Sequence, residues 1–401
     1  MHELARIIRE EIAREGPIPF SRYMELALYH PTLGYYAGGG QGREPVGWGG
    51  DYFTSGDVHP LWGWCIARRL HSMWREMGCP DRFDVVEPGA GRGLLARDVW
   101  GYALESAPDW AEVLRYTLVD RALAASPLRS RREERLRAAL TTLGAPLDRL
   151  RWAPALEDAA EPNGLTGCVV SNELVDALPI HLLQKQGGAL REVYVAVDDA
   201  THGFIETLGE PSSLEVAGYL DRFHIPWRTY SDGWRAEVCV EALDWMQAVA
   251  QSVRRGYALT IDYGDAARRL YTPERRRGTL ATYMRHQFSD SVLTDPGARD
   301  LTAHVNFSAL ALAGWASGLR LVELTSQATF LERQGIREEA EALVARLFPA
   351  AETERWTDRG QADLLRRKAL FGAVATLLNP HGLGGFRVLV QRREEWVQPA
   401  T

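Results

Sequence analysis

Three glycines follow a short apolar segment that ends in an acidic residue. In DVVEPGAGRGLLARDVW, residues 84–100, Glu87 comes two positions before the first of Gly89, Gly91 and Gly93. A strand, a glycine turn and a helix in this order present backbone N–H groups and the positive end of the helix to a ligand. Glycine is needed because a Cβ atom would block the ligand's approach to the backbone. The spacing therefore predicts a small-ligand site at this turn.

The spacing of the glycines also distinguishes between ligands. A dinucleotide fingerprint requires a third glycine at position 94, which is Leu94. The pattern Gly-x-Gly-x-Gly after an acid resembles that of class I S-adenosylmethionine methyltransferases, whose ligand carries a cationic amino-acid end and a ribose. Glu87 would favour the positive charge, and Asp120, which ends the next predicted strand, would accept hydrogen bonds from the ribose. The alternative is a glycine turn with a structural role alone.

A second polar segment, SNELVDALP at residues 171–179, follows another predicted strand. Glu173 and Asp176 are three positions apart, so in a helix they would share a face and converge on one cation, such as a guanidinium. We expect both to be catalytic and Asn172, at the strand end, to bind the cofactor. The alternative is a pair of acids that stabilises the positive end of a helix.

Methyl transfer from a sulfonium depends on alignment and on exclusion of water, so no covalent nucleophile is expected. If the acceptor is a guanidinium it must lose a proton, and Glu173, Asp262 or His304 would be the base. Thr54 and Ser55 would bind the cofactor's carboxylate, unless they only cap a helix. A lone histidine such as His304 is also consistent with a cap or a packing role. The remaining candidates for contacts with substrate are Asp262, Tyr263 and Asn306, followed by Trp48, Tyr283 and His286.

Short apolar runs alternate with helical stretches from Phe83 onward, which predicts a parallel sheet covered on both faces. The predicted fold class is α/β, a doubly wound, seven-stranded, Rossmann-like sheet with an inserted small α+β module and an N-terminal helical cover. The last strand alternates more clearly and could be an antiparallel edge. The expected strands are Phe83–Val86, Tyr116–Val119, Arg151–Trp152, Cys168–Ser171, Tyr257–Ile261, Arg320–Leu324 and Phe386–Gln391.

The predicted domains are a cover with a glycine-rich loop at residues 1–80, a methyltransferase domain at 81–180 and 255–401, and an inserted lid at 181–254. In the insertion, Gly187 and Gly188 predict a hairpin turn, Phe204–Leu208 a third strand and Ser213–Phe223 a helix. The β-rich insertion offers a surface for a homodimer.

Composition excludes several classes of protein. The chain has 401 residues, 46% hydrophobic and 25% charged, which is typical of globular domains. Its net charge of -7 argues against a nucleic-acid binder, and the basic runs at Arg129–Arg137 and Arg275–Arg277 are expected to be solvated. Four cysteines without a CxxC pair predict neither a zinc ribbon nor disulfides, and we expect no metal. No apolar stretch is long enough for a membrane span, and the N-terminus does not resemble a signal peptide, so a cytoplasmic location is expected.

Eight segments together resemble, in order, the motifs of the MidA family of methyltransferases. The match extends from Ile18 to Ile336. The resemblance implies the class I fold, S-adenosyl-L-methionine as cofactor and, because mitochondrial members methylate an arginine of a complex I subunit, a protein arginine as substrate. The segments are GPIPFSRYMELALYHPTLGYY, GDYFTS, EPGAGRG, SNELVDALP, LTIDYG, GTLATYMRHQ, PGARDLTAHVNFSAL and TSQATFLERQGI.

The chain departs from the family at two positions. Gly56 and Asp57 follow Thr54-Ser55 where the family has Pro-Glu, and Asn306 replaces an acid. These departures leave open a methyltransferase that acts on a small molecule or a peptide. A non-catalytic assembly factor with the same fold is a further alternative, although such a protein would have no need of Glu87, the glycines and Asp120.

Overall fold

The computed structural model describes residues 3–38, 44, 46–47, 50–120, 128–159, 164–284, 287–289, 291–354 and 356–393. The candidates Trp48 and His286, and the side chain of Tyr283, lie outside this description.

A mixed sheet of seven strands forms the centre of the described chain and confirms the predicted doubly wound α/β class. Its order is β16-β17-β10-β5-β2-β3-β4, and β2, β3, β4, β5 and β10 run parallel. The prediction of an antiparallel last strand is confirmed, but its place at the edge is wrong, because β17 pairs with both β10 and β16. Val388, Leu389 and Val390 are consecutively buried, as in an interior strand. The bounds are β2 Phe83–Pro88, β3 Leu114–Val119, β4 Leu150–Ala153, β5 Leu165–Asn172, β10 Val253–Asp262, β16 Arg320–Ser326 and β17 Arg387–Arg393.

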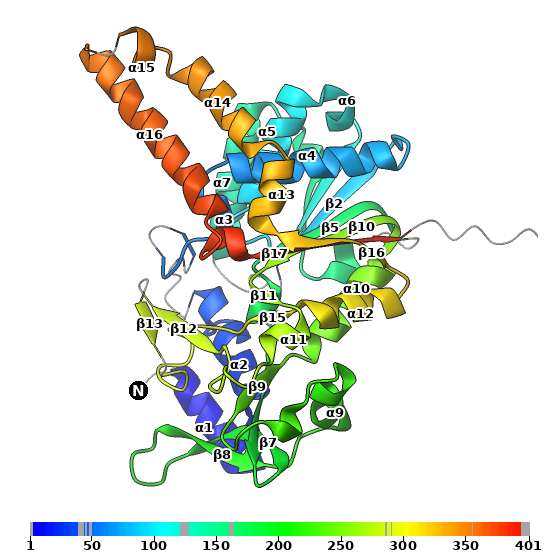
Figure 1. Cartoon of the computed structure of the whole chain (residues 1–401), viewed down its shortest axis with the longest axis vertical. Coiled ribbons are helices and arrows are strands. Elements are labelled where there is room, and N and C mark those ends of the chain that lie inside the picture. The colour runs from blue at the N-terminus through cyan, green and yellow to red at the C-terminus, as the bar shows by residue number, and fades with distance from the viewer. Residues whose placement is uncertain are drawn as a thin grey trace, which may run out of the picture.

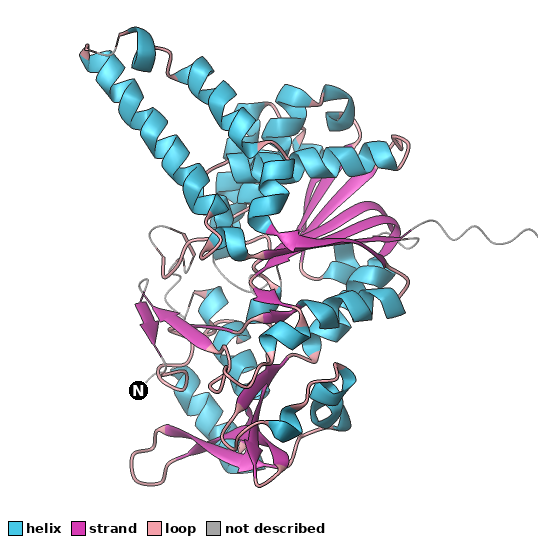
Figure 2. Cartoon of the chain, in the orientation of Figure 1, coloured by secondary structure: helices cyan, strands magenta, loops and turns pink. Residues whose placement is uncertain are grey.

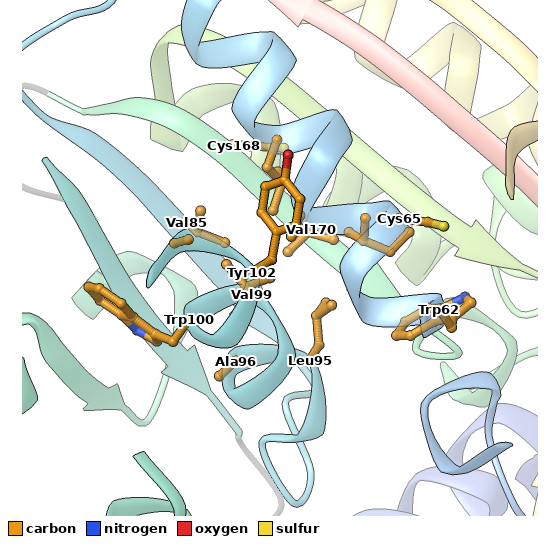
Figure 3. Packing of buried hydrophobic residues seen from close by; sticks show 14 of the residues in the cluster. Trp62, Cys65, Val85, Leu95, Ala96, Val99, Trp100, Tyr102, Cys168 and Val170 are labelled. Atoms are coloured by element: carbon orange, nitrogen blue, oxygen red, sulfur yellow. The ribbon is translucent and has the colours of Figure 1, made fainter. Parts of the chain in front are cut away.

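Helices cover both faces of this sheet (Figures 1 and 2). Alternate strand residues point to opposite faces, so Val85 packs under the layer of α4, α5 and α7, whereas Val86 packs under α8, α10 and α12. Figure 3 labels Trp62, Leu95 and Val99 of the first layer among the buried residues of the cluster that also contains Val85. The bounds are α3 Ser55–Val58, α4 Leu61–Glu76, α5 Leu94–Ser106, α6 Pro108–Ala111, α7 Leu128–Leu143, α8 Leu156–Ala159, α10 Glu241–Ser252, α12 Phe307–Ala316, α13 Gln327–Arg333, α14 Ile336–Leu347, α15 Ala350–Thr353 and α16 Asp358–Leu378.

A second lobe lies opposite the strand ends (Figure 1). Its larger sheet has the order β1-β7-β6-β9, with β8 paired to β7. The predicted hairpin is confirmed: Gly187 and Gly188, both at positive φ, join β6 to β7. The bounds are α1 Glu3–Glu15, β1 Ile18–Pro19, α2 Phe20–Tyr29, β6 His181–Gln186, β7 Ala189–Val197, β8 Phe204–Gly209, α9 Leu214–Arg222, β9 Arg235–Val238, β11 Gly264–Asp265, α11 Ala267–Leu270, β12 Ala281–Met284, β13 Gln287–Ser289, β14 Asp300–Thr302 and β15 Val305–Asn306.

Packing divides the chain differently from the predicted domains. The amphipathic helices α4 and α10 bury their apolar faces on the central sheet, although the predicted boundaries assigned them to the cover and to the insertion. Conversely, Leu301 and Ala303 pack with Ile18 and Phe20 of the N-terminal segment. The described helices include none with the length and apolar character that a bilayer span requires.

Candidate active site

The glycine turn joins β2 to α5 with all three glycines in the left-handed region. Their φ angles are +71° at Gly89, +52° at Gly91 and +72° at Gly93, where L side chains are strained. A Cβ atom on Gly93 would lie 2.5 Å from Leu136 Cδ2, whereas the nearest described atom to one on Gly91 would be the Gly89 carbonyl oxygen at 3.8 Å. Gly93 thus permits α5 to pack, and Gly91 leaves the backbone open on its ligand side.

A cavity of about 300 Å³ lies at the carboxyl ends of β2, β3, β4 and β5, the place where open α/β sheets bind ligands. Besides the glycine turn, its walls come from the N-terminal segment, the segment after β4 and α10. The predicted site residues that line it are Thr54, Glu87, Gly89, Gly91, Asp120, Asn172 and Glu173.

Glu87 is buried beside the turn, where it accepts a hydrogen bond from the Tyr116 hydroxyl at 2.7 Å. Burial raises the pKa of Glu87 to about 8. Asp120 lies at the end of β3, with its Oδ2 3.7 Å from Arg132 Nη1. Arg132 itself is 5% exposed and forms an ion pair with Glu44, so the prediction of a solvated basic run is wrong at this position.

Glu173 enters the cavity from a strained turn. Its φ is +49°, in the left-handed region that residues other than glycine rarely adopt. Glu173 Oε1 accepts hydrogen bonds from the Ser55 N–H at 3.1 Å and from Asn172 Nδ2 at 3.0 Å, while Oε2 accepts none from the described residues. Burial is the main cause that raises the pKa of Glu173, to about 8. One carboxylate oxygen is therefore left for a ligand.

Asp262 holds that turn in place. Its Oδ2 accepts hydrogen bonds from the N–H groups of Leu174, Val175 and Asp176 at 3.2, 2.9 and 3.2 Å, and its Oδ1 accepts one from the Tyr263 N–H. Asp262 is fully buried and does not line the cavity. The predicted contact of Asp262 with substrate is therefore not found, because its oxygens fix the backbone beside Glu173.

Asp176 and Glu173 do not converge on one cation. The chain turns at Glu173 and then forms a short 3-10 helix, Val175–Ala177, so the expected helical face is absent there. Asp176 accepts a hydrogen bond from the Tyr263 hydroxyl outside the cavity lining, and burial raises its pKa to about 6. The predicted catalytic role of Asp176 and the predicted substrate contact of Tyr263 both lack support in this geometry.

His304 and Asn306 also lie outside the cavity lining. His304 is exposed, and its ring meets that of Tyr263 edge-on at 5.4 Å. The Asn306 side chain caps α12, where it accepts the Ala309 N–H at 3.2 Å. A helix cap was the alternative role for His304, but the residue that caps α12 is Asn306. An acidic residue at position 306 would cap this helix equally well.

The Thr54-Ser55 segment is a helix start. The Thr54 N–H donates to Asp57 Oδ2 at 3.0 Å, which forms one half of a capping box at α3. Asp57 also forms an ion pair with Arg92 of the glycine turn, so the departure at Gly56-Asp57 preserves the cap. Ser55 is fully buried outside the cavity lining, and its Oγ accepts a hydrogen bond from Gln327. Its predicted contact with cofactor has no support in this geometry, because the Ser55 N–H already binds Glu173 and its hydroxyl contacts Gln327.

Several lining residues were not predicted from the sequence. Glu157 follows β4, Glu241 and Trp245 belong to α10, and Tyr29 and Tyr36 belong to the N-terminal cover. The helical periodicity of α10 was visible, but which of its side chains reach the cavity depends on how the helix docks. The two tyrosines lie in the first of the motif segments, whose several aromatic residues could have indicated a contact with a ligand.

The cavity suits a ligand with positive charge and hydroxyl groups. Among the described residues, five carboxyl side chains and two arginines line it, and both arginines are ion-paired. The Asn172 Oδ1 atom is buried without a hydrogen-bond partner, which leaves an acceptor for a ligand ammonium. The carboxyl residues are Glu87, Asp120, Glu157, Glu173 and Glu241.

Comparisons with known proteins agree with this geometry. The family model for S-adenosyl-L-methionine-dependent methyltransferases matches residues 65–325. A COG1565 superfamily member from Burkholderia thailandensis, solved with bound S-adenosyl-homocysteine, is 32% identical, with a TM-score of 0.81 over 97% of this chain and 92% of that chain. The Drosophila melanogaster homolog of the protein arginine methyltransferase NDUFAF7 is 29% identical over 86% of this chain and 78% of its own length. The human NDUFAF7 is 27% identical over 83% of this chain and 73% of its own length.

These findings confirm the resemblance to the MidA family, the methyltransferase activity and the cofactor S-adenosyl-L-methionine. They also correct one expectation. The Drosophila and human relatives are named as mitochondrial proteins, which contradicts the predicted cytoplasmic location.

Proposed function

Because the chain belongs to the family of S-adenosyl-L-methionine-dependent methyltransferases, we propose that it methylates an arginine guanidinium of a protein substrate. The observation that carries this proposal is the Glu173 side chain, which lines the same cavity as the glycine turn and keeps one oxygen that accepts no hydrogen bond from the described part of the chain. The relatives named protein arginine methyltransferases support the same acceptor.

The lining residues fit the cofactor. The open backbone at Gly91 would receive its amino-acid end, the orphaned Asn172 Oδ1 its ammonium, and Asp120 its ribose hydroxyls. Glu87 would favour the positive charge from beneath the turn. When bound, the cofactor supplies a methyl group on a sulfonium sulfur. Thr54 would contribute a wall of the cavity, because its own hydrogen bonds serve the cap of α3.

Glu173 would perform the proton transfer. The guanidinium nitrogen forms its bond to the methyl carbon while the carbon–sulfur bond breaks and its electron pair stays on sulfur. The nitrogen's proton passes to Glu173 Oε2, so that the methylated guanidinium keeps its single positive charge. The bound cations would favour the ionised form of Glu173, and a carboxylate whose pKa burial raises to about 8 is then suited to accept a proton near neutral pH. The Ser55 N–H and Asn172 hold the other oxygen and orient the group.

Glu173→Gln tests this assignment. We expect the variant to transfer an isotopic methyl group to arginine at least 100-fold more slowly, as loss of a general base implies, with nearly unchanged affinity for S-adenosyl-homocysteine, which lacks the sulfonium charge. Mass spectrometry of labelled proteins and metabolites measures the transfer, and calorimetry measures the affinity. Asp176→Asn, three residues away but outside the cavity lining, should slow transfer by less than about threefold. Label found only on small molecules, or equal loss in both variants, would contradict the proposal.

The predicted homodimer stays a prediction. It is supported by β8, which lies at the edge of the second lobe's sheet, and by Ile205 of that strand, which is 44% exposed. Light scattering should give twice the chain mass of 44.8 kDa. A monomer at all accessible concentrations would contradict it.

A further inference from the structure

Three tyrosines belong to one wall of the cavity that Glu173 also lines. Tyr29 ends α2, Tyr36 lies in the 3-10 turn Tyr35–Ala37, and Tyr52 precedes the Thr54 cap. The rings of Tyr29 and Tyr36 lie 5.5 Å apart with an interplanar angle of 37°. The same wall includes Ala177 and Leu178, so it is aromatic and apolar apart from the hydroxyl groups.

The protein itself uses the hydroxyl groups of two of these tyrosines. The Tyr29 hydroxyl donates to the Ala177 carbonyl at 3.1 Å, and the Tyr36 hydroxyl donates to Asp300 Oδ1 at 2.9 Å. These hydrogen bonds fix the orientation of the two rings. A ligand at this wall would therefore contact the ring faces and not the hydroxyl groups. The negative face of an aromatic ring attracts cations, and a planar guanidinium stacks on it.

Carboxyl groups behind the wall favour a cationic ligand, because a nearby cation stabilises their ionised forms. Asp300 lies behind Tyr36, and the Asp176 carboxyl interacts electrostatically with both Tyr36 and Tyr52. The two arginines of the cavity lining, Arg92 and Arg132, are ion-paired with Asp57 and Glu44. A positive side chain would therefore meet π-surfaces on one side and the free oxygen of Glu173 on the other.

We propose that Tyr29, Tyr36 and Tyr52 form the acceptor subsite, an aromatic wall that binds the side chain to be methylated in its charged form beside Glu173. The proposal rests on the proposed function for the identity of that side chain. It assigns to the N-terminal segment, which the sequence presented only as a cover, the selection of the substrate.

Binding to the protein saturated with S-adenosyl-homocysteine tests the subsite without catalysis. The probes are Nα-acetyl-arginine N-methylamide and its neutral isostere, Nα-acetyl-citrulline N-methylamide, both measured by calorimetry. We expect the arginine probe to bind about tenfold more tightly than the citrulline probe, in line with a desolvated cation–π contact. Equal affinities of the wild-type protein for the two probes would overturn the subsite.

Variants identify the rings as the cause. Tyr36→Leu and Tyr52→Leu should lose the preference for arginine, whereas Tyr36→Phe and Tyr52→Phe, which keep the ring, should retain it within about threefold. An unchanged affinity for S-adenosyl-homocysteine shows that each variant is folded. Leucine variants that keep the preference would overturn the proposal.

The two proposals fail in different ways. If the arginine probe binds as expected but no arginine in any protein receives label, transfer to arginine is wrong and the subsite stands. If arginine receives label and the leucine variants keep the wild-type KM for the acceptor, the subsite is wrong and the proposed function stands.

Discussion

Glu173 combines three features: a strained backbone, a partly buried carboxyl group and an oxygen that accepts no hydrogen bond from the described residues. Left-handed φ at a residue other than glycine costs about 1–2 kcal/mol and persists only where the surroundings enforce it. Here Asp262 enforces it through three consecutive N–H groups. Strain and burial of this kind are typical of functional positions.

The raised pKa values of Glu87 and Glu173 predict a pH dependence of cofactor binding. Both are raised to about 8, so both groups hold their protons near pH 7 in the empty cavity. A cation favours the ionised carboxylates, so binding releases protons and affinity for S-adenosyl-L-methionine should rise between pH 6 and 7.5. The rise is about tenfold per pH unit for each group that gives up its proton.

Calorimetry in two buffers with different ionisation enthalpies measures the number of protons released. Glu87→Gln should reduce that number, since one titrating group is then removed. An affinity that is constant over this pH range would contradict the account of the two carboxyl groups.

At the same scale, sequence reasoning identified the cavity residues that follow directly after strands. Glu87, Asp120, Asn172 and Glu173 all line the cavity, because the carboxyl ends of parallel strands share one edge. Residues whose position depends on a side-chain partner were misassigned. Ser55 and Asn306 are polar residues near the site whose hydrogen bonds turned out to serve the protein itself.

The two positions at which the chain differs from its family lie at the starts of helices α3 and α12. Asn306 and Asp57 stand where the family has acids, and both serve at helix starts. Aspartate and asparagine are similarly effective as N-caps, and the N3 acid Asp57 still bonds the N-cap N–H, so neither change requires a different substrate. The expectation that these positions mark a change of substrate is therefore unsupported.

The cap assignment of Asn306 is testable by stability. Asn306→Asp should change the free energy of unfolding by no more than a few tenths of a kcal/mol, whereas Asn306→Ala should cost about 1 kcal/mol because the Ala309 N–H loses its acceptor. Urea denaturation measures the stability, and both variants should keep the wild-type KM for the methyl acceptor. A raised KM with unchanged stability would restore a role for Asn306 in substrate binding.

Two glycines of the glycine turn have different roles: Gly93 permits the packing of α5, and Gly91 leaves space for the ligand. Gly93→Ala should lower stability by about 2–4 kcal/mol, since it adds backbone strain and a Cβ atom 2.5 Å from Leu136 Cδ2. Gly91→Ala should cost only the strain of about 1–2 kcal/mol, yet weaken cofactor binding because its Cβ occupies the open side of the turn. Equal effects of the two variants on stability and affinity would contradict this division.

Periodicity predicted the elements of the central sheet well, because each strand and helix is a local pattern. The order of the last two strands was not predictable in this way, since the insertion of β17 between β10 and β16 is a tertiary choice. For the same reason α4 and α10 were assigned to the wrong lobes: an amphipathic face shows that a helix packs, and not against which sheet.

In the whole molecule, the cavity joins the two lobes. Tyr29 and Tyr36 belong to the second lobe and Glu87, Asp120 and Glu173 to the sheet, so a ligand that fills the cavity contacts both. The ion pair between Asp57 and Arg92 connects the α3 start to the glycine turn. Binding should therefore stabilise the assembly of the lobes as well as the sheet.

Hydrogen exchange in the presence of S-adenosyl-homocysteine tests this coupling. At 100 times its Kd the ligand should stabilise the fold by about 2.7 kcal/mol and slow exchange both in the glycine turn and in α2. Asp120→Ala, at the same ligand concentration, should show weaker protection in both places. Protection confined to the glycine turn would mean that the lobes are not coupled through the cavity.

The most direct test of the central claim is a crystal structure with S-adenosyl-homocysteine and Nα-acetyl-arginine N-methylamide bound together. We predict the cofactor product against the glycine turn with its ribose at Asp120, and the guanidinium between the tyrosine wall and Glu173 Oε2, with a nitrogen aligned toward the sulfur. A cofactor product bound away from the glycine turn, or a guanidinium held elsewhere than at Glu173, would contradict the account.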